Sequence, residues 1–373
     1  MLTLGIICAL LASAFALDTD LPAPTAKRCT GTISSLADVA AAQVCTTIIV
    51  HQQLHRPGQT FAINAATGAT ITMAGDVTFG FAEWAGPLML VSGQNVTFNG
   101  NGHTLFGRGD LYWLGGNGGV TKPAPFIRVN NAGSFSNVRI LNAPERSVAV
   151  KGSQVTISGI MIDNSLGDLP NSRSNGLPAG EPINVGHNTD GFGISNANNV
   201  IIQNSSVHNQ DDCLAVNGGT NITFQNNVCV GGHGISIGSI ASNVVVNNVH
   251  ITENTVMNNT NGLRIKTDAT ATASTVSDIV YTDNKLSGIT EFGVLIDQSY
   301  PDTLGLHAGT GVVINGVTFS GTNTISVTSV AQRVSVNCGS TGSCFGTWNF
   351  AALTVTGGAA GTIRDAPVTG GLF

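Results

Sequence analysis

Short segments that alternate apolar and polar residues recur along this chain. This period of two is typical of short β-strands with one buried face. The segments are "NVTFNGNG" from Asn95, "NVRILN" from Asn137, "QVTISG" from Gln154, "NVIIQNS" from Asn199, "NITFQNN" from Asn221, "NVHITENTV" from Asn248, "DIVYTDN" from Asp278 and "NGVTFSG" from Asn315. The pattern predicts an all-β protein.

The spacing of these segments favours a parallel β-helix. The starts at 199, 221, 248 and 278 are 22, 27 and 30 residues apart, which is the length of one solenoid coil. An antiparallel sandwich would show hairpin signals at closer spacing, such as Asn-Gly between two alternating runs, and few are present. Asn, Gly and Ser at the strand ends suit sharp corners, because Asn and Gly tolerate left-handed backbone angles and Asn side chains can form ladders between coils.

The segment Thr32 to Cys45, "TISSLADVAAAQVC", has the Ser start and alanine-rich pattern of a short helix. We expect it to cap the N-terminal end of the solenoid. The composition agrees with a β protein, since 47 of the 373 residues are Gly and only 6% are aromatic. The net charge of -6 argues against a nucleic-acid partner.

The first residues predict export. Residues 1–16 form one apolar run that ends in Ala14-Phe15-Ala16, the pattern of a signal peptide. Residues 17–28 end in Lys27-Arg28 and suggest a propeptide, with an ordered N-terminal arm as the alternative. Residues 29–373 contain no linker and are predicted to form one domain, soluble, secreted and extracellular.

Cysteine usage fits an oxidising compartment. Six cysteines follow the signal segment and allow fifteen pairings, but they group into three local pairs. This grouping favours Cys29–Cys45, Cys213–Cys229 and Cys338–Cys344. Zinc is not favoured, because no CxxC or HxxxH motif accompanies them. Candidate N-glycosylation sites are Asn95, Asn204, Asn221 and Asn258.

Charged residues gather in one part of a weakly charged chain. Asp190 precedes Asp211 by 21 residues, and Asp212 precedes His233 by the same step. If a coil has that length, these side chains stack on one face about 4.8 Å apart. The adjacent pair Asp211-Asp212 would point to opposite faces of a regular strand, so we expect the strand to end or bulge there.

Two cations continue this column. Arg264 and Lys266 flank Ile265, which on a strand sends both charges outward and the isoleucine into the core. Each piece alone is also typical of a turn or a solvated corner, whereas their common register favours a site. Crowded carboxylates next to cations suit hydrolysis of an anionic glycan, because one acid must keep a proton while another is ionised. Arg264 and Lys266 are predicted to bind a sugar carboxylate.

These motifs resemble those of the polygalacturonase family of glycoside hydrolases. They are Asn188-Thr189-Asp190, Asp211-Asp212, Gly232-His233-Gly234 and Arg264-Ile265-Lys266. "NQDDC", "GGHGISIGSI" and "GVLIDQSYP" extend the resemblance to fungal secreted endopolygalacturonases over nearly the whole mature chain. The resemblance implies a right-handed parallel β-helix with an open cleft, and inverting hydrolysis of α-1,4 links in de-esterified homogalacturonan.

The resemblance also implies roles for individual residues. Asp211 is expected to be the general acid, while Asp190 and Asp212 activate water and His233 belongs to the proton network. Substrate binding is expected from Asn188, Arg264, Lys266 and Tyr300. No cofactor or metal is implied. Polygalacturonate is the expected partner of a monomer, and plant inhibitor proteins are further partners by family resemblance.

Two departures from the family pattern bear on the mode of action. Gly193 stands where the family commonly has Asp, so a substrate contact by that carboxylate is absent. The segment Ser165 to Gly186 is longer than expected and could wall one end of the cleft, which would make the enzyme exo-acting. Endo-action is favoured, and an exo-polygalacturonase is the alternative.

Other classes of protein remain open at this point. A pectate lyase would share the fold but needs calcium-binding carboxylates and a basic residue that removes a sugar proton. Rhamnogalacturonan hydrolases resemble the family too, but they typically lack the His233 and Arg264-Ile265-Lys266 motifs. A non-catalytic pectin-binding β-helix would bind the polymer without making reducing ends.

Overall fold

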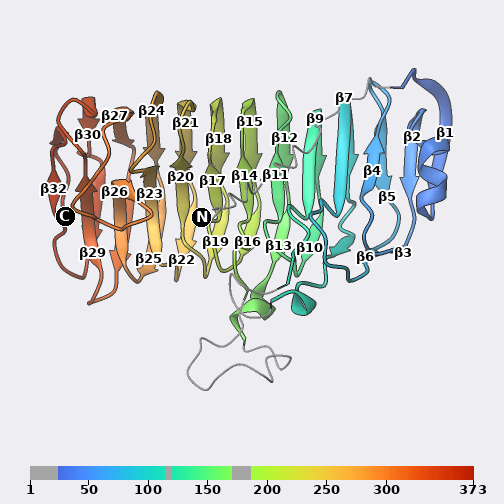
Figure 1. Cartoon of the computed structure of the whole chain (residues 1–373), viewed down its shortest axis with the longest axis horizontal. Coiled ribbons are helices and arrows are strands. Elements are labelled where there is room, and N and C mark those ends of the chain that lie inside the picture. Colours follow the sequence, from blue (N-terminus) through green and yellow to red (C-terminus); the bar gives the residue numbers. More distant parts are fainter. Residues whose placement is uncertain (1–23, 114–119, 170–185) are drawn as a thin grey trace, which may run out of the picture.

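The strands of the chain stack as the coils of a parallel β-helix. The computed structural model describes residues 24–113, 120–169 and 186–373. Figure 1 shows the coils side by side along the long axis, with the short helix at the N-terminal end. Strands pair in parallel with the strands of the next coil, in two sheets of 22 and 11 strands. The predicted fold class is confirmed.

Each full coil contributes one strand to each of three ladders, and the long strands β7 and β9 contribute to two. The first ladder contains β4 (Phe61–Asn64), β7 (Met89–Asn99), β9 (Ile127–Ser136), β11 (Val148–Val150), β14 (Phe192–Ile194), β17 (Leu214–Val216), β20 (Ile235–Ile240), β23 (Asn261–Asp268), β26 (Phe292–Tyr300), β29 (Gln332–Asn337) and β32 (Ile363–Arg364). The second ladder contains β1 (Lys27–Ile33), β2 (Cys45–Val50), β5 (Thr70–Met73), the later parts of β7 and β9, β12 (Val155–Ser158), β15 (Ala197–Gln203), β18 (Gly219–Gln225), β21 (Val245–Thr252), β24 (Ser274–Thr282), β27 (Val312–Ser320), β30 (Cys344–Asn349) and β33 (Val368–Thr369). The third ladder contains β3 (Gln53–His55), β6 (Val77–Phe79), β8 (Thr104–Phe106), β10 (Arg139–Leu141), β13 (Met161–Asp163), β16 (Ser206–His208), β19 (Val228–Val230), β22 (Thr255–Met257), β25 (Lys285–Ile289), β28 (Asn323–Val327) and β31 (Leu353–Thr356).

The inward side chains of successive coils form one continuous apolar core. In the second ladder Ile202 is in register with Phe224, and Phe224 with Ile251, and all three are fully buried. Burial of apolar area at about 25 cal/mol per Å² is the dominant favourable term in such a stack. Each coil thus shares its core with its neighbours.

In most of the repeated segments, the polar residue at the start lies at the bend into the second ladder. These residues adopt left-handed backbone angles, with φ of 58° at Gln154, 56° at Asn199 and Asn221, and 55° at Asn248 and Asp278. In the segment that starts at Asn315, the next residue, Gly316, takes this corner with φ of 82°. Asn and Gly adopt this conformation at low cost, which explains why they recur at these positions.

Buried asparagines form a ladder inside the solenoid. The side chain of Asn254 accepts a bond of 3.0 Å from the backbone N–H of Asn227, and Asn284 accepts one of 3.0 Å from Asn254. Asn323 continues the ladder with a bond of 3.1 Å from Asn284. Each amide thereby satisfies a backbone group of the coil before it, so the predicted ladder between coils is confirmed.

The N-terminal end is closed by a short helical cap. A 3-10 turn, η1 (Leu36–Asp38), leads into α1 (Val39–Ala42), so the helix is shorter than the Thr32 to Cys45 segment predicted for it. Asp38 accepts bonds of 3.0 and 2.9 Å from the backbone N–H groups of Ser34 and Ser35. The described residues also include the 3-10 turns η2 (Gly109–Leu111) and η4 (Ser165–Asp168).

The three disulfides are those predicted: Cys29–Cys45, Cys213–Cys229 and Cys338–Cys344. Lys27 and Arg28 are exposed at the start of β1, while the predicted signal segment 1–16 lies outside the described residues. Within the described ranges, no helix is long and apolar enough to cross a membrane. The candidate glycosylation sites Asn95, Asn204, Asn221 and Asn258 are all exposed.

Candidate active site

The turns that lead from the third ladder into the first bring the charged residues together. β14, β17 and β20 align Phe192 with Leu214 and Leu214 with Ile235. Asp190, Asp212 and His233 each lie two residues before these aligned positions, whereas Asp211 lies three residues before. The register therefore pairs Asp190 with Asp212, and not with Asp211 as the 21-residue spacing predicted, because this coil has 22 residues.

Asp211 and Asp212 lie before the first residue of β17, so the strand begins only after the pair. This irregular backbone lets both carboxylates reach one side, as expected from the sequence. The disulfide between Cys213 and Cys229 joins this turn to the next coil. A cavity of about 400 Å³ opens over the turn. Its lining includes Asn188, Asp190, Asp211, Asp212, Lys266 and Tyr300.

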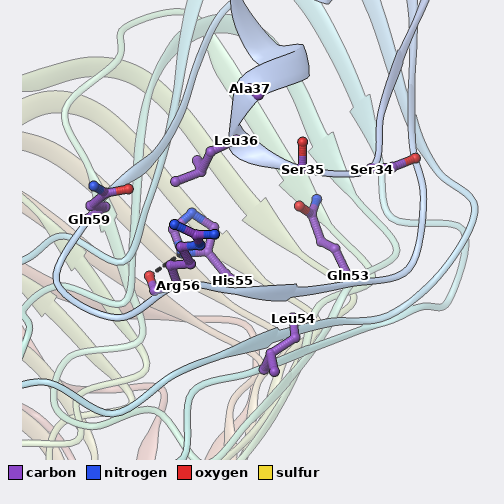
Figure 2. Close-up of a pocket in the computed structure, with 9 residues that line it drawn as sticks. All are labelled: Ser34, Ser35, Leu36, Ala37, Gln53, Leu54, His55, Arg56 and Gln59. Carbon is purple, nitrogen blue, oxygen red and sulfur yellow. Dashed lines mark hydrogen bonds between the residues drawn. The ribbon is translucent and has the colours of Figure 1, made fainter.

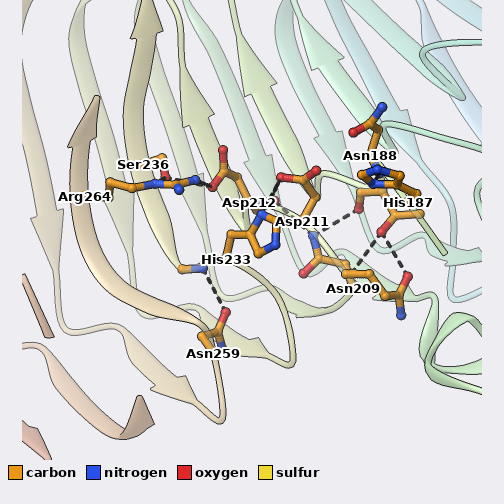
Figure 3. Close-up of polar contacts among 12 residues, drawn as sticks. His187, Asn188, Asn209, Asp211, Asp212, His233, Ser236, Asn259 and Arg264 are labelled. Carbon is orange, nitrogen blue, oxygen red and sulfur yellow. Dashed lines mark hydrogen bonds and ion pairs between the residues drawn. The ribbon is translucent and has the colours of Figure 1, made fainter. Parts of the chain in front are cut away.

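Asp212 is held by two cations and a hydroxyl group. Only 2% of the residue is exposed. One carboxylate oxygen accepts bonds from Arg264 Nη2 at 2.5 Å and Ser236 Oγ at 2.7 Å, and the other accepts a bond of 2.9 Å from Lys266 Nζ. Figure 3 shows Arg264 reaching across to Asp212 beside Ser236. Both oxygens thus meet cationic donors, which is the environment of a buried carboxylate anion.

Asp211 is paired with His233. Its Oδ1 accepts a bond of 2.8 Å from the backbone N–H of Asp212 and lies 3.0 Å from His233 Nδ1 (Figure 3). Burial opposes ionisation of Asp211, but the His233 bond and charge and the backbone bond outweigh burial and lower its pKa. The same bond raises the pKa of His233 against the effect of its own burial. The contact therefore favours an ionised Asp211 beside a protonated His233.

Asp190 has the opposite environment. Burial, followed by the negative charges of Asp211 and Asp212, raises the pKa of Asp190 to about 8. Among the described residues, no side chain donates a hydrogen bond to its carboxylate. Asp212 is thus bound by two cations, Asp211 is paired with His233, and Asp190 keeps its proton at neutral pH. Such different environments for neighbouring carboxyl groups are typical of acid-base sites.

The two cations of β23 differ in their access to the cavity. Ile265 between them is fully buried. Lys266 lines the cavity and lies over the Tyr300 ring, with Nζ 5.3 Å from the ring centre. Arg264 is not among the lining residues, and its Nε donates a bond of 3.0 Å to Ser236 Oγ. The guanidinium that the sequence predicts to bind a sugar is therefore engaged by Asp212 and Ser236.

The sequence interpretation missed two polar residues that shape the site. Ser236 could have been found from the alternation on β20, since Ile235 and Ile237 point inward and the serine between them must point to the site. Asn209 is fully buried and donates bonds of 3.0 Å to the backbone carbonyls of Thr189 and Asp212. No sequence signal separates Asn209 from the many structural asparagines.

A further network joins the site to the turn η4. Gln210 donates bonds of 2.8 Å to the Asn164 carbonyl and 2.7 Å to Asp168, and His208 lies 2.6 Å from the same aspartate. The start of the predicted cleft-wall segment is thus tied to the turn that holds Asp211. The rest of that segment, 170–185, lies outside the described residues.

Gly193 lines the cavity floor. An added Cβ there would meet no heavy atom within 4 Å, so the missing side chain leaves open space in the cavity. Asn188 also lines the cavity and has a left-handed backbone with φ of 54°.

Asp211, Asp212 and His233 are also the donor set best placed for a metal ion in the described part of the chain, with ligand atoms within 4.8 Å of one another. However, Arg264 and Lys266 already bind both oxygens of Asp212. A divalent cation would have to displace these positive charges, so the protein's own cations take the place that a metal would occupy.

The chain is similar in sequence to one family of known enzymes. A family model described as glycosyl hydrolases family 28 matches residues 42–369. The chain is 41% identical over 331 residues to an endo-polygalacturonase of Sclerotinia sclerotiorum, covering 85% of this chain and 80% of that protein. It is 38% identical over 347 residues to a polygalacturonase of Saccharomyces cerevisiae, covering 90% of each.

Solved structures agree with this similarity. The structure of endopolygalacturonase I from Stereum purpureum complexed with two galacturonate superimposes with a TM-score of 0.85 and 44% identity, covering 92% of this chain and 99% of that one. The polygalacturonase from Erwinia carotovora gives a TM-score of 0.61 at 16% identity, covering 92% and 97%, which supports the fold alone.

Proposed function

Because this chain belongs to family 28 of the glycosyl hydrolases, we propose that it is an endo-acting polygalacturonase that hydrolyses the α-1,4-galacturonosyl links of pectin with inversion. The observation that carries the proposal is the division of Asp190, Asp211 and Asp212 into three distinct environments around one cavity. An inverting glycosidase needs a proton donor and an ionised group for water.

Asp211 is assigned the general acid. It faces the cavity beside His233, and it can act as the acid once it holds a proton. In the free site, the raised pKa of Asp190 favours the proton there. Transfer of that proton to Asp211 leaves the total charge unchanged, and it removes the negative charge that disfavours ionisation of Asp190. Asp190 and Asp211 therefore titrate as a coupled pair, and together they can supply one acid and one base.

Asp190 and Asp212 are assigned to the attacking water. Inversion requires the acid and base carboxyls to stand about 6.5–9.5 Å apart with the water between them. Arg264 and Lys266 hold the carboxylate of Asp212 in place at the cavity. Asp190, aligned with Asp212 on the preceding coil, takes the proton of the water once ionised.

Substrate binding is assigned to Lys266, Tyr300 and Asn188, which line the cavity. Lys266 supplies a positive charge and Tyr300 a ring face against which a sugar can pack. Arg264 is assigned a positioning role, because its donors hold Asp212 and Ser236 and it does not line the cavity.

The proposed enzyme is a secreted protein. Three disulfides support an extracellular protein, with residues 1–16 as signal peptide and 17–28 as propeptide. We propose a monomer, with glycans at one or more of the four exposed sequons and with plant inhibitor proteins as macromolecular partners.

Time-resolved proton NMR of polygalacturonate digestion tests the activity, since it reports bond chemistry, anomer and product length together. Nascent β-reducing ends on mixed oligomers are the expected result. Monogalacturonate alone would indicate exo-action, unsaturated ends would indicate a lyase, and an unchanged spectrum would leave a binding protein.

A further inference from the structure

Strand β26 carries one extra residue just before Tyr300. Its register with β23 pairs Lys266 with Asp297, but the next pair joins Asp268 to Tyr300. Three residue steps on β26 therefore lie opposite two steps on β23, which is a β-bulge. Bulges are frequent next to active sites, where they change the direction of a side chain.

The bulge decides the face of β26 on which Tyr300 lies. Ile296 is buried in the core, and side chains two residues apart share a face, so residues 298 and 300 of a regular strand would also point inward. The extra residue instead places Tyr300 in register with Asp268, which shares the face of Lys266. Tyr300 thereby lines the catalytic cavity, with its ring centre 5.3 Å from Lys266 Nζ.

Asp297 accepts hydrogen bonds from the bulge and from the loop that follows it. Only 3% of Asp297 is exposed. Its Oδ1 accepts bonds of 2.9 Å from the Ser299 backbone N–H, 2.7 Å from the Ser299 hydroxyl and 2.9 Å from Asn337 Nδ2. Its Oδ2 accepts a bond of 2.7 Å from the backbone N–H of Leu304. Four donors on one buried carboxylate thus join the bulge to the loop.

The loop after Tyr300 is held in a strained conformation. Leu304 has a left-handed backbone with φ of 52°, which a bulky residue keeps only where its surroundings impose it. The Gly305 N–H donates a bond of 2.7 Å to the Ser299 hydroxyl, and the Gly305 carbonyl accepts one of 3.1 Å from Asn337. These bonds hold both ends of the segment that contains Tyr300.

We propose that Asp297 is a positioning residue for substrate binding. It does not line the catalytic cavity itself, and it acts through Tyr300, whose ring it keeps beside Lys266. The ring can pack against a galacturonate unit only while the bulge and the loop keep this arrangement. The part of Tyr300 in binding rests on the proposed function, whereas the effect of Asp297 on the position of Tyr300 rests on the hydrogen bonds alone.

Asp297→Asn in the full chain tests the proposal with almost no change of side-chain volume. The amide keeps one acceptor oxygen but turns a donor toward the Leu304 N–H, which then loses its partner. We expect KM for polygalacturonate to rise about tenfold while kcat stays within about threefold, because the carboxylates of the catalytic cavity are unchanged. A native KM in this variant would overturn the proposal.

A double-variant cycle decides whether Asp297 acts through Tyr300. Tyr300→Ala should itself raise KM, and in that background Asp297→Asn should change KM by less than about twofold, because the ring that it positions is gone. Two effects that multiply in the double variant would show that Asp297 affects binding by another route, and the proposal would fall. If Asp297→Asn does not fold, Ser299→Ala takes its place in the cycle, since it removes the hydroxyl that bonds both Asp297 and Gly305.

Fluorine NMR of the chain labelled with 3-fluorotyrosine follows Tyr300 without relying on activity. The chain has three tyrosines, and the other two, Tyr112 and Tyr281, are buried. Asp297→Asn should shift the Tyr300 resonance while the other two resonances stay in place. An unmoved Tyr300 resonance would contradict the positioning role.

The same label separates this proposal from the proposed function. Digalacturonate should shift the Tyr300 resonance of the chain that carries Asp211→Asn, which leaves the ligand intact. If this shift is missing and the native chain does not hydrolyse polygalacturonate, the proposed function is wrong, whatever Asp297→Asn does to the Tyr300 resonance.

Asp38→Asn is the matched control. Asp38 Oδ2 also accepts three bonds, from the backbone N–H groups of Ser34 and Ser35 and from the Ser35 hydroxyl. Both serines line a cavity of about 340 Å³ at the helical cap, which shares no lining residue with the catalytic cavity (Figure 2). KM, kcat and the Tyr300 resonance should all stay native in this control. An equal rise in KM in both variants would indicate a general loss of stability and would overturn the positioning role.

Discussion

Arg264 donates a hydrogen bond to Asp212 from a strand two coils away, and Lys266 binds the other oxygen of the same carboxylate. The deepest acid of the site is thus neutralised by the protein before any substrate binds. A residue type that sequence motifs associate with substrate recognition can therefore act by fixing the charge and orientation of a catalytic group.

Arg264→Ala should reduce kcat more than it raises KM. Loss of a charged hydrogen bond costs roughly 1.5–3 kcal/mol, so we expect a fall of about 10- to 100-fold in kcat. Lys266→Ala is the comparison, because Lys266 also lines the cavity and its loss should raise KM as well. Steady-state kinetics on polygalacturonate measure both values. A raised KM with native kcat in the Arg264 variant would instead indicate that Arg264 binds the substrate directly.

Ser236→Ala should lower kcat about tenfold, because Asp212 and Arg264 lose the hydroxyl that joins them. Ser335→Ala on β29 is a matched control: it is also a fully buried serine of the first ladder, and it bonds Gln332 away from the site. If both variants lose the same activity and the same stability, the role of Ser236 is structural only.

Asp211→Asn should abolish turnover while oligogalacturonate binding and the fold persist. General acid catalysis contributes about 10²- to 10⁴-fold, which sets the expected loss in kcat. His233 should also lose the raised pKa that its bond to Asp211 provides. Product assays, calorimetric binding and an NMR titration of His233 check the three expectations. Full activity in this variant would refute the assignment.

The raised pKa of Asp190 should make the free energy of unfolding depend on pH. Its pKa is raised from 3.8 to about 8 in the folded protein, so the unfolded chain releases this proton first. The free energy of unfolding should therefore decrease as pH rises between about 4 and 8. Asp190→Asn should flatten this slope and make the protein more stable at pH 7, on the order of 4 kcal/mol, because about three pH units separate 3.8 from 7.

Urea unfolding at several pH values measures this slope. Asp365→Asn, an exposed aspartate near the C-terminal end, is the control and should follow the native chain. An unchanged slope in the Asp190 variant would mean that another group holds the proton.

The sequence by itself determined the fold and grouped the charged residues of the proposed site, but it did not indicate Ser236 or Asn209. Strand alternation and coil-length spacing are local patterns, and the left-handed corners favour Asn and Gly, so these features can be recognised without coordinates. The three disulfides were recoverable because each joins cysteines that are close in the sequence. Asp190 and His233 could be grouped with the pair Asp211-Asp212 because each lies about one coil from that pair.

Only the tertiary structure decided what each charge does. A difference of one residue in one coil aligns Asp190 with Asp212, and side-chain direction then turns Arg264 away from the cavity toward that carboxylate. The proton on Asp190 depends on burial and on two charges from the neighbouring coil. Such effects act over a few ångströms between residues far apart in sequence, so no pattern along the chain contains them.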